Sequence, residues 1–165
     1  MPMRIIRSLI TLVFGLFLLG GIASAIGAAI LKGRLESRGE EADDEVDLVA
    51  IYEGRDLTST ATAFRGGSVL AWYGGGTLDL RGATLDPAGA AIDLRAIFGG
   101  IRLVVPETWR VERAMVGIFG GTGDARDPDR VAPDGPTLHL TGFAVFGGAG
   151  IVSEAPDLAP VASTV

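Results

Sequence analysis

A three-residue motif recurs along this chain: an aromatic residue followed by two glycines. Periods of about 20–50 residues are typical of repeat proteins, in which each unit buries its apolar face on a neighbour. Successive copies here are 25, 21 and 27 residues apart, and "FRGG" at Phe64 is a degenerate further copy. The four clear copies are Tyr73, Gly74, Gly75; Phe98, Gly99, Gly100; Phe119, Gly120, Gly121; and Phe146, Gly147, Gly148.

Short runs with a period of two lie between these copies. Leu78 and Leu80 alternate with Asp79 and Arg81, as expected for a strand with one buried face. Gly, Pro or Asp bounds each run, and no convincing helix pattern occurs from residue 51 to 151. Similar runs lie at residues 92–95, 101–105, 109–112 and 138–141.

Repeat and alternation together predict an all-β domain, a β-solenoid-like stack of short strands. We expect the glycine pair to form a corner of each coil, by supplying a positive φ or a bulge. The aromatic residue would stack on its counterpart in the next coil, inside the domain. An antiparallel sandwich with similar turns is the alternative.

The chain begins with an apolar segment. Residues 8–31 contain no charge and, as a helix, are long enough to cross a hydrocarbon core of about 30 Å. We therefore expect one transmembrane α-helix in residues 1–32 of a single-pass membrane protein. A cleaved secretory signal ending near Ala23-Ser24-Ala25 is the alternative.

Two features of this segment concern its surroundings. Basic residues flank it on both sides, so their distribution does not set its orientation, and the side of the β domain stays open. Gly20, Ser24 and Ala28 are spaced by four and mark a candidate helix–helix contact, because small residues let two helices approach closely.

The remaining domain boundaries follow from composition. Residues 33–50 are rich in acidic side chains and are predicted to be a solvated juxtamembrane linker. Residues 51–152 would form the β-solenoid-like domain. Residues 153–165, rich in Pro and Ala, are predicted to be a disordered tail.

Composition argues against several function classes. The chain has no Cys and one His, which excludes thiolate metal sites and zinc sites built from several histidines. The net charge of −6 argues against a nucleic-acid partner. We expect no cofactor.

No residue pattern points to catalysis or to a metal. His139 alternates with leucines and should face solvent. The acidic stretch from Asp124 to Asp134 misses the spacing of a calcium loop, and Arg126 and Arg130 offset its charge. Trp109 follows a Val-Pro pair in an alternating strand and is expected in the core, although an aromatic binding platform is the alternative.

Four segments occur in an order similar to that of a known family. They are "YGGGTLDLRGATL", "AIFGGIRLVVPETWRVE", "GIFGGTGDAR" and "LTGFAVFGGAGI", within residues 63–152. On these motifs the chain resembles the C-terminal, toastrack-like domain of LiaF-type cell-wall-active antibiotic response proteins. The resemblance implies a membrane-tethered β-solenoid-like domain linked to envelope-stress signalling, usually by restraining a sensor kinase. Relatives often have several transmembrane helices or an extra N-terminal domain, whereas this chain has one span and an acidic spacer.

These observations lead to a functional expectation. The protein should be a membrane-anchored, non-enzymatic binding protein that modulates the cell-envelope stress response through contact with a membrane sensor kinase. A self-assembling membrane-bound β-solenoid scaffold is one alternative. A binding module for cell-wall glycan or lipid intermediates, with exposed aromatic residues, is the other.

Overall fold

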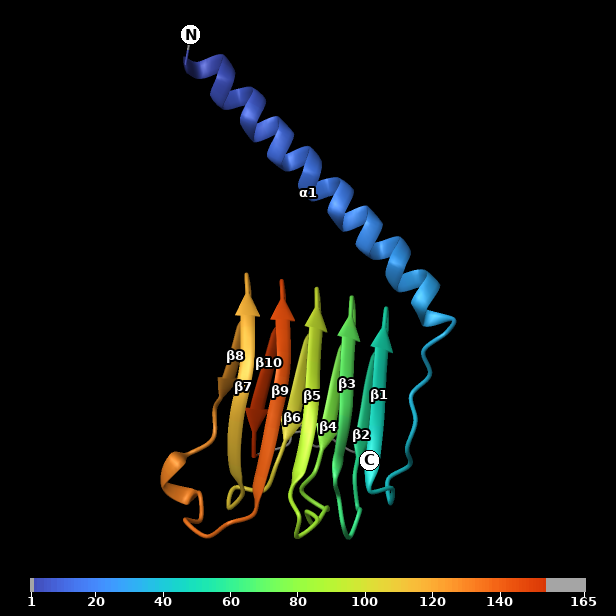
Figure 1. Ribbon diagram of the computed structural model, residues 1–165, viewed down its shortest axis with the longest axis vertical. Helices are drawn as coiled ribbons and strands as arrows, with labels where there is room; N and C mark the ends of the chain where they lie inside the picture. Colours follow the sequence, from blue (N-terminus) through green and yellow to red (C-terminus); the bar gives the residue numbers. More distant parts are fainter. Residues whose placement is uncertain (1, 154–165) are drawn as a thin grey trace, which may run out of the picture. The chain divides into compact units, whose positions relative to one another are not determined.

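The computed structural model describes residues 2–153, which fall into two compact parts (Figure 1). One part extends to Glu36 and is helical, and the other begins at Ser37 and is built of strands. We call the second part the β domain. The predicted tail lies outside the described residues from residue 154 on.

The helical part consists of α1, Pro2–Lys32. Residues Ile6–Lys32 have a mean hydropathy of 2.4, and α1 is long and apolar enough to cross a membrane. A signal sequence near an N-terminus meets the same criterion, so the anchor and the cleaved signal both stay open. No acidic residue lies in the first turn, and Lys32 lies in the last turn.

The β domain is a succession of five repeat units, each with two short strands. We number these units 1 to 5 in chain order. They are β1 (Glu45–Ile51) with β2 (Gly54–Thr58), β3 (Gly66–Trp72) with β4 (Gly75–Asp79), β5 (Ala90–Ile97) with β6 (Gly100–Val104), β7 (Arg110–Ile118) with β8 (Gly121–Asp124), and β9 (Thr137–Val145) with β10 (Gly148–Val152).

The two strands of each unit belong to different sheets. The first strands form a sheet in the order β1-β3-β5-β9-β7, and the second strands form a sheet in the order β2-β4-β6-β10-β8. Every pairing between these strands is parallel, so the antiparallel sandwich is wrong. The described chain is thus mainly β, with one helix before two parallel sheets.

The order of the units in space differs from their order in the chain. Unit 5 lies between units 3 and 4, because β9 pairs with both β5 and β7, and β10 with both β6 and β8. Stacking in chain order, which the repeat predicted, therefore holds only for units 1 to 3. A short 3₁₀ helix, Pro128–Arg130, lies in the connection between units 4 and 5.

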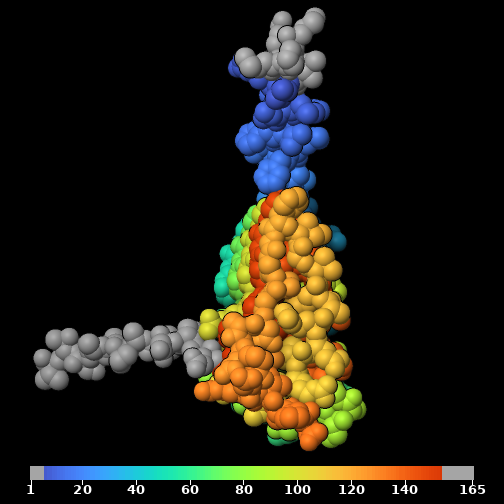
Figure 2. Space-filling view, turned by 90° about the vertical axis from the view of Figure 1, so that its left-hand side faces the viewer, coloured from blue at the N-terminus to red at the C-terminus, as the bar shows by residue number. Residues whose placement is uncertain are grey.

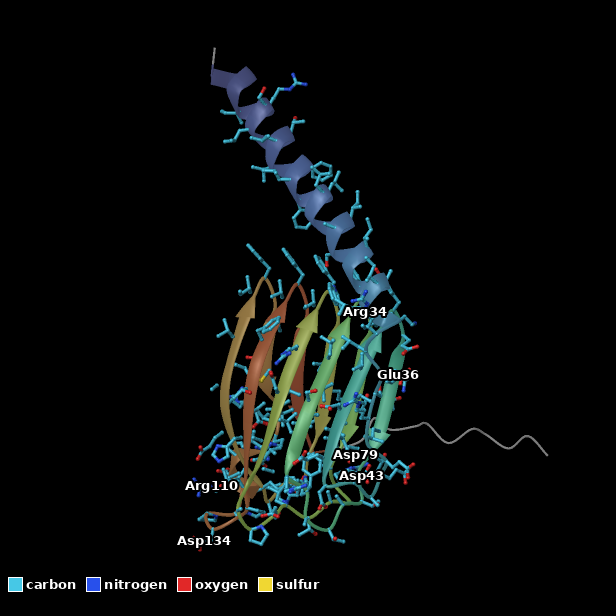
Figure 3. All side chains as sticks on the ribbon, turned by 45° about the vertical axis from the view of Figure 1, so that its right-hand side comes forward. Arg34, Glu36, Asp43, Asp79, Arg110 and Asp134 are labelled. Carbon is cyan, nitrogen blue, oxygen red and sulfur yellow. The ribbon has the colours of Figure 1, made fainter. Side chains whose placement is uncertain are left out.

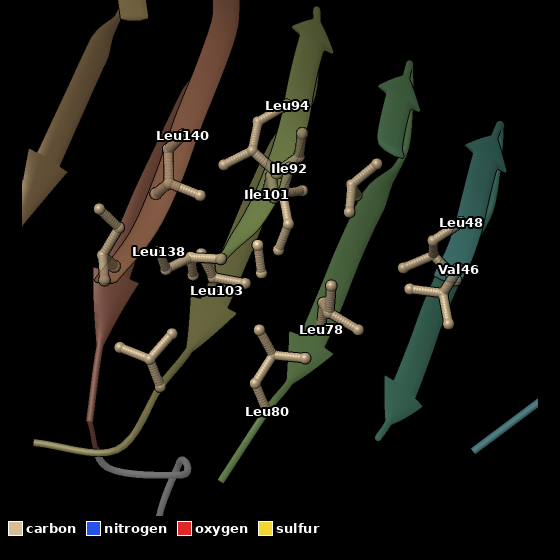
Figure 4. Close-up of a cluster of buried hydrophobic side chains, with 14 of the residues drawn as sticks. Val46, Leu48, Leu78, Leu80, Ile92, Leu94, Ile101, Leu103, Leu138 and Leu140 are labelled. Carbon is tan, nitrogen blue, oxygen red and sulfur yellow. The ribbon is translucent and has the colours of Figure 1, made fainter. Parts of the chain in front are cut away.

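The core lies between the two sheets (Figure 4). Each strand points alternate side chains inward, and leucines and isoleucines from facing strands, such as Leu94 and Leu103, are almost fully buried. Phe64 is also fully buried and forms a bridge with Leu85. "FRGG" is therefore not a further corner, as the repeat suggested, but part of the core at the start of unit 2.

The segment predicted to be a linker contributes to the β domain. β1 begins at Glu45, and before it the backbones of Arg38 and Asp47 exchange two hydrogen bonds of 2.8 Å. Ser37 Oγ accepts a hydrogen bond from the Val49 amide (3.0 Å) and donates one to its carbonyl (3.3 Å). Residues from Ser37 onward thus cover the outer edge of β1, and the expected boundary at residue 51 is too late.

Candidate interaction surface

Each repeat unit turns from the first sheet to the second at an aromatic corner. The rings are parallel within 8° and their centroids are 4.9–5.4 Å apart, so they form one continuous stack. We call this stack the aromatic ladder. In spatial order its members are Tyr52, Tyr73, Phe98, Phe146 and Phe119.

The backbone of the ladder is unusual. All five aromatic residues have φ between 50° and 57°, in the left-handed region that side chains rarely adopt. The expectation that the glycines supply the positive φ is therefore wrong, since the aromatic residue takes it. Such a conformation costs about 1–3 kcal/mol and persists only where the surroundings impose it. Ring stacking and backbone hydrogen bonds such as Tyr73 N to Ile97 O (3.0 Å) impose it here.

The glycine after each aromatic residue is required by close approach of the neighbouring unit. A Cβ on Gly99 would lie 2.4 Å from the carbonyl oxygen of Gly74, and one on Gly147 would lie 2.1 Å from that of Gly99. A Cβ on Gly120 would in turn lie 2.1 Å from the carbonyl oxygen of Gly147. The series follows the spatial order of units 2, 3, 5 and 4, so the glycines let these backbones pack.

The corner of unit 1 was missed in the sequence because it lacks this glycine. Its residues are Tyr52, Glu53 and Gly54. Glu53 lies at the end of the stack, where no further unit of the described residues 2–153 lies on its outer side, so a side chain fits there. The spacing of 21 residues between Tyr52 and Tyr73 was the signal that could have revealed it.

A second glycine follows in every unit, and sterics do not require it. These residues pair in register at the start of the second sheet. A Cβ on Gly54, Gly100 or Gly121 would meet nothing within 4 Å, and none of these residues has a positive φ. The backbone is therefore left uncovered along a row beside the ladder. We call it the glycine row, and its members are Gly54, Gly75, Gly100, Gly148 and Gly121.

On the other side of the ladder lie the last residues of the first sheet. They are also in register, and all are apolar. This apolar row consists of Ile51, Trp72, Ile97, Val145 and Ile118. Ile51 is almost fully buried, whereas the other four are half-buried or exposed. We call the apolar row, the corners and the glycine row together the corner edge. Glu53 is its only charged residue, and it pairs with Arg55 at 3.1 Å.

The ladder lies at the surface and not in the interior, as had been expected. Its inner members are half-buried, whereas Tyr52 at one end is 44% exposed and Phe119 at the other is 79% exposed. Aromatic rings in this position stay in contact with water, which is unfavourable in free energy compared with burial in a core. The corner edge is therefore a candidate binding surface.

The opposite end of the β domain is charged (Figure 3). Asp79 and Arg81 pair at 2.7 Å, and the side-chain hydrogen bond from Arg81 is the largest cause that lowers the Asp79 pKa. Burial raises the pKa of Asp124, but hydrogen bonds from Arg126 outweigh it, so that this pKa is also below its ordinary value. Along the strand direction, the β domain therefore has one nearly uncharged end, the corner edge, and one charged end.

The outer edge of unit 4 is open (Figure 2). Val116 and Ile118 on β7 are 59% and 48% exposed, and Phe119 follows them at the corner. Within residues 2–153 no segment pairs with the outer side of β7, whereas Ser37 and Arg38 cover that of β1. The first sheet therefore has one edge that is partly covered, at β1, and one uncovered edge with apolar side chains, at β7.

The polar residues singled out in the sequence have structural partners. His139 is exposed on β9, with its Nδ1 3.2 Å from Glu112 Oε2. Arg130 pairs with Glu107 at 2.9 Å, and Asp127 accepts a hydrogen bond from the Asp129 amide at the 3₁₀ helix. Across the described residues no three or more His, Asp or Glu side chains lie where they could hold a metal ion.

The two tryptophans differ in environment. Trp109 is buried and belongs to the core cluster, as its strand pattern predicted. Its carbonyl accepts a 2.8 Å hydrogen bond from Arg126 Nη1. Trp72 is half-buried in the apolar row, since Val69 and Ala71 on the same strand point into the core.

The candidate helix–helix contact lies on α1. Gly20, Ser24 and Ala28 are all helical, and their spacing of four places them along one face. A Cβ on Gly20 would meet nothing within 4 Å. Contact between this face and another helix stays a prediction.

Comparison with known proteins returned no match from family models, from curated proteins or from solved structures.

Proposed function

We propose that this protein is a membrane-anchored binding protein without catalytic activity, and that its β domain engages another membrane protein through the open edge of unit 4. The observation that carries the proposal is the exposure of Val116, Ile118 and Phe119 at the end of the stack where no described segment covers the first sheet. The apolar α1 supports the anchor.

The open edge is suited to strand addition. β7 is nine residues long and presents backbone N–H and C=O groups on its outer side. Soluble proteins usually protect such edges, because they pair readily with another strand. An extended segment of a partner would gain main-chain hydrogen bonds there, and the exposed apolar side chains would add specificity.

The partner that we propose is a membrane sensor kinase of the cell-envelope stress response. The support is the similarity of the aromatic-Gly-Gly segments to LiaF-type proteins, together with a β domain that is tethered to an apolar helix. In this proposal the five units act as a solenoid-like stack in which units 4 and 5 are exchanged. The rigid stack presents β7 as a fixed edge to the kinase.

A self-assembling scaffold is the second candidate, and the same edge favours it. β7 of one copy can pair with β7 of another in antiparallel orientation, which gives a symmetric dimer. The covered edge of β1 would stop growth at two copies. A dimer, not a long filament, is therefore the expected form of this alternative.

Site-specific crosslinking distinguishes these candidates. A photoreactive residue replaces Ile118 at the open edge or, as the control, Ala91, which is exposed on the central strand β5. Cells carrying the full chain are irradiated with and without a wall-targeting antibiotic. We expect a crosslink to a histidine kinase from position 118 that changes with the antibiotic, and none from position 91. Crosslinks between copies alone support the scaffold, and the absence of any specific crosslink at position 118 contradicts binding through this edge.

A further inference from the structure

The two ends of the β domain differ in chemistry, and this difference points to a second interaction surface. The corner edge combines an aromatic ladder, an apolar row and a glycine row, with Glu53 as its only charge. The open edge of unit 4 is lined by one repeat unit, whereas all five units contribute to the corner edge. A partner that contacts the whole corner edge must therefore span all five units.

We propose that the corner edge rests in the headgroup layer of the membrane that α1 anchors. The inference rests on the anchoring part of the proposed function and concerns a different surface from the open edge of unit 4. Tyr and Trp side chains concentrate at membrane interfaces, where an aromatic ring and a polar group are both accommodated. Tyr52, Trp72 and Tyr73 lie together on units 1 and 2 of this edge.

The segment that connects α1 to the β domain enters the β domain near the corner edge. Lys32 ends α1, and Ser37 is already held by the backbone of Val49. Five residue steps at up to about 3.6 Å each limit the separation of Lys32 and Ser37 to about 18 Å. Val49 is three residues from the ladder residue Tyr52, so the chain emerges next to the corner edge of unit 1.

The distribution of charge favours an orientation in which the corner edge, and not the charged end, faces the lipid surface. Glu41, Asp43 and Asp44, which precede β1, lie toward the charged end, where Asp43 and Asp134 are visible in Figure 3. Anionic headgroups repel such residues. The orientation with the corner edge on the membrane keeps these carboxylates away from the headgroups and brings an almost uncharged surface to them.

The glycine row fits the same partner. Glycine is not required there by φ or by sterics at Gly54, Gly100 and Gly121, yet all five units have it. A row without side chains gives a smooth surface and offers exposed peptide groups to headgroups. In this orientation the strands point toward the membrane and the stack lies along it, so the open edge of unit 4 faces sideways toward neighbouring membrane proteins.

The two native tryptophans allow a direct test. Trp72 lies on the corner edge, and Trp109 is buried at the start of unit 4, before β7. The full chain is reconstituted into phosphatidylcholine–phosphatidylglycerol vesicles as Trp109→Phe, which keeps only Trp72, or as Trp72→Phe, which keeps only Trp109. Fluorescence is compared between ordinary lipids and lipids brominated near the headgroup end of their acyl chains. Far-UV circular dichroism verifies that both variants fold.

The expected result is selective quenching. An interfacial ring lies about 5–10 Å into the headgroup and acyl boundary, so brominated lipid should reduce Trp72 emission about twofold while Trp109 emission stays unchanged. A second pair of variants uses open glycine positions. Gly100→Asp with Gly121→Asp places charges on the glycine row and should abolish the quenching of Trp72. Gly123→Asp with Gly150→Asp, further along the second sheet, should preserve it.

Three results would overturn the proposal. Vesicles that retain the chain but quench neither tryptophan show an intact anchor without docking. Equal quenching of both tryptophans shows contact without the proposed orientation. Trp72 that is protected from lipid, in a chain that crosslinks to a second copy through a photoreactive residue in place of Phe98, shows that protein covers the corner edge. A chain that fails to stay with the vesicles contradicts the anchor itself, and thus the proposed function on which the inference rests.

Discussion

A Cβ at the second residue of a corner tests the packing of the repeat units most sharply. Gly99 lies between units 2 and 3, and an added Cβ would be 2.4 Å from the carbonyl oxygen of Gly74 and 3.3 Å from that of Ala71. The neighbour is backbone, so it cannot turn away as a side chain would. Gly100, the next residue, has nothing within 4 Å of its Cβ position.

The magnitude follows from these contacts. Relief of the clash requires a shift of about 1 Å, which would break the 3.1 Å hydrogen bond from Gly100 N to Gly74 O. Overpacking costs about 1–3 kcal/mol, and the lost hydrogen bond adds about 1 kcal/mol. Gly99→Ala should therefore lower the free energy of unfolding by about 2–4 kcal/mol. Gly100→Ala should leave it unchanged or raise it by about 0.4–1 kcal/mol, because alanine restricts the unfolded chain.

Thermal unfolding of the full chain in detergent micelles measures the difference. Helical and β-sheet signals overlap in far-UV circular dichroism, but α1 keeps its backbone hydrogen bonds in the apolar micelle, so the change on heating reports on the β domain. At about 4 °C per kcal/mol for a domain of this size, Gly99→Ala should melt roughly 8–16 °C below the unmodified chain, and Gly100→Ala should not melt below it. Equal melting temperatures for the two variants would refute the close-approach argument.

Three further predictions concern the ladder and the charged end. Phe98→Ala loses two stacked neighbours and should cost about 1–3 kcal/mol of unfolding free energy, whereas Phe119→Ala loses one and should cost about half as much in the same melting assay. Arg126→Ala removes a side chain that is only 4% exposed and should cost about 3–5 kcal/mol, against at most about 1 kcal/mol for the exposed Arg130→Ala; similar losses would contradict the assigned burial. The pKa of Asp124 is lower in the folded protein, so its contribution to stability is present above its ordinary pKa of 3.8 and is lost as the pH falls below that value. In urea titrations, the difference in unfolding free energy between the unmodified chain and Asp124→Asn should become smaller as the pH decreases through this range. A difference that became larger would contradict the direction of the pKa shift.

The local features of the β domain could be predicted from the sequence. The period of two at Leu78 and Leu80 indicates strands, and the repeated aromatic-Gly-Gly motif indicates corners. Strands and corners can be recognised in this way because each depends on residues that are close in the sequence. The start of β1 was missed although its pattern is present. Val46 and Leu48 alternate with acidic residues, and the density of negative charge obscured the alternation.

The order of the units and the backbone of the corners could not be predicted in the same way. The exchange of units 4 and 5 depends on which unit can tolerate an exposed side. β7 carries Arg110, Glu112 and Arg113, which suit an end position, whereas β9 has Leu138 and Leu140 in the core.

Positive φ at an aromatic residue contradicts the ordinary preference for glycine, so residue type alone points to the wrong position. The nearly uncharged character of the corner edge also appears only after the register brings residues from five units together. No single segment of the sequence displays that surface.

The most direct test of the account is whether α1 remains in the mature protein and holds it in the membrane. Membranes from cells expressing the full chain are washed with alkaline carbonate, and the retained protein is mapped by peptide mass spectrometry. The account predicts retention in the washed membranes, with peptides from residues 8–31 present. Release of the protein with its first peptide starting after Ala25 would identify a cleaved signal and contradict the anchored binding protein proposed here.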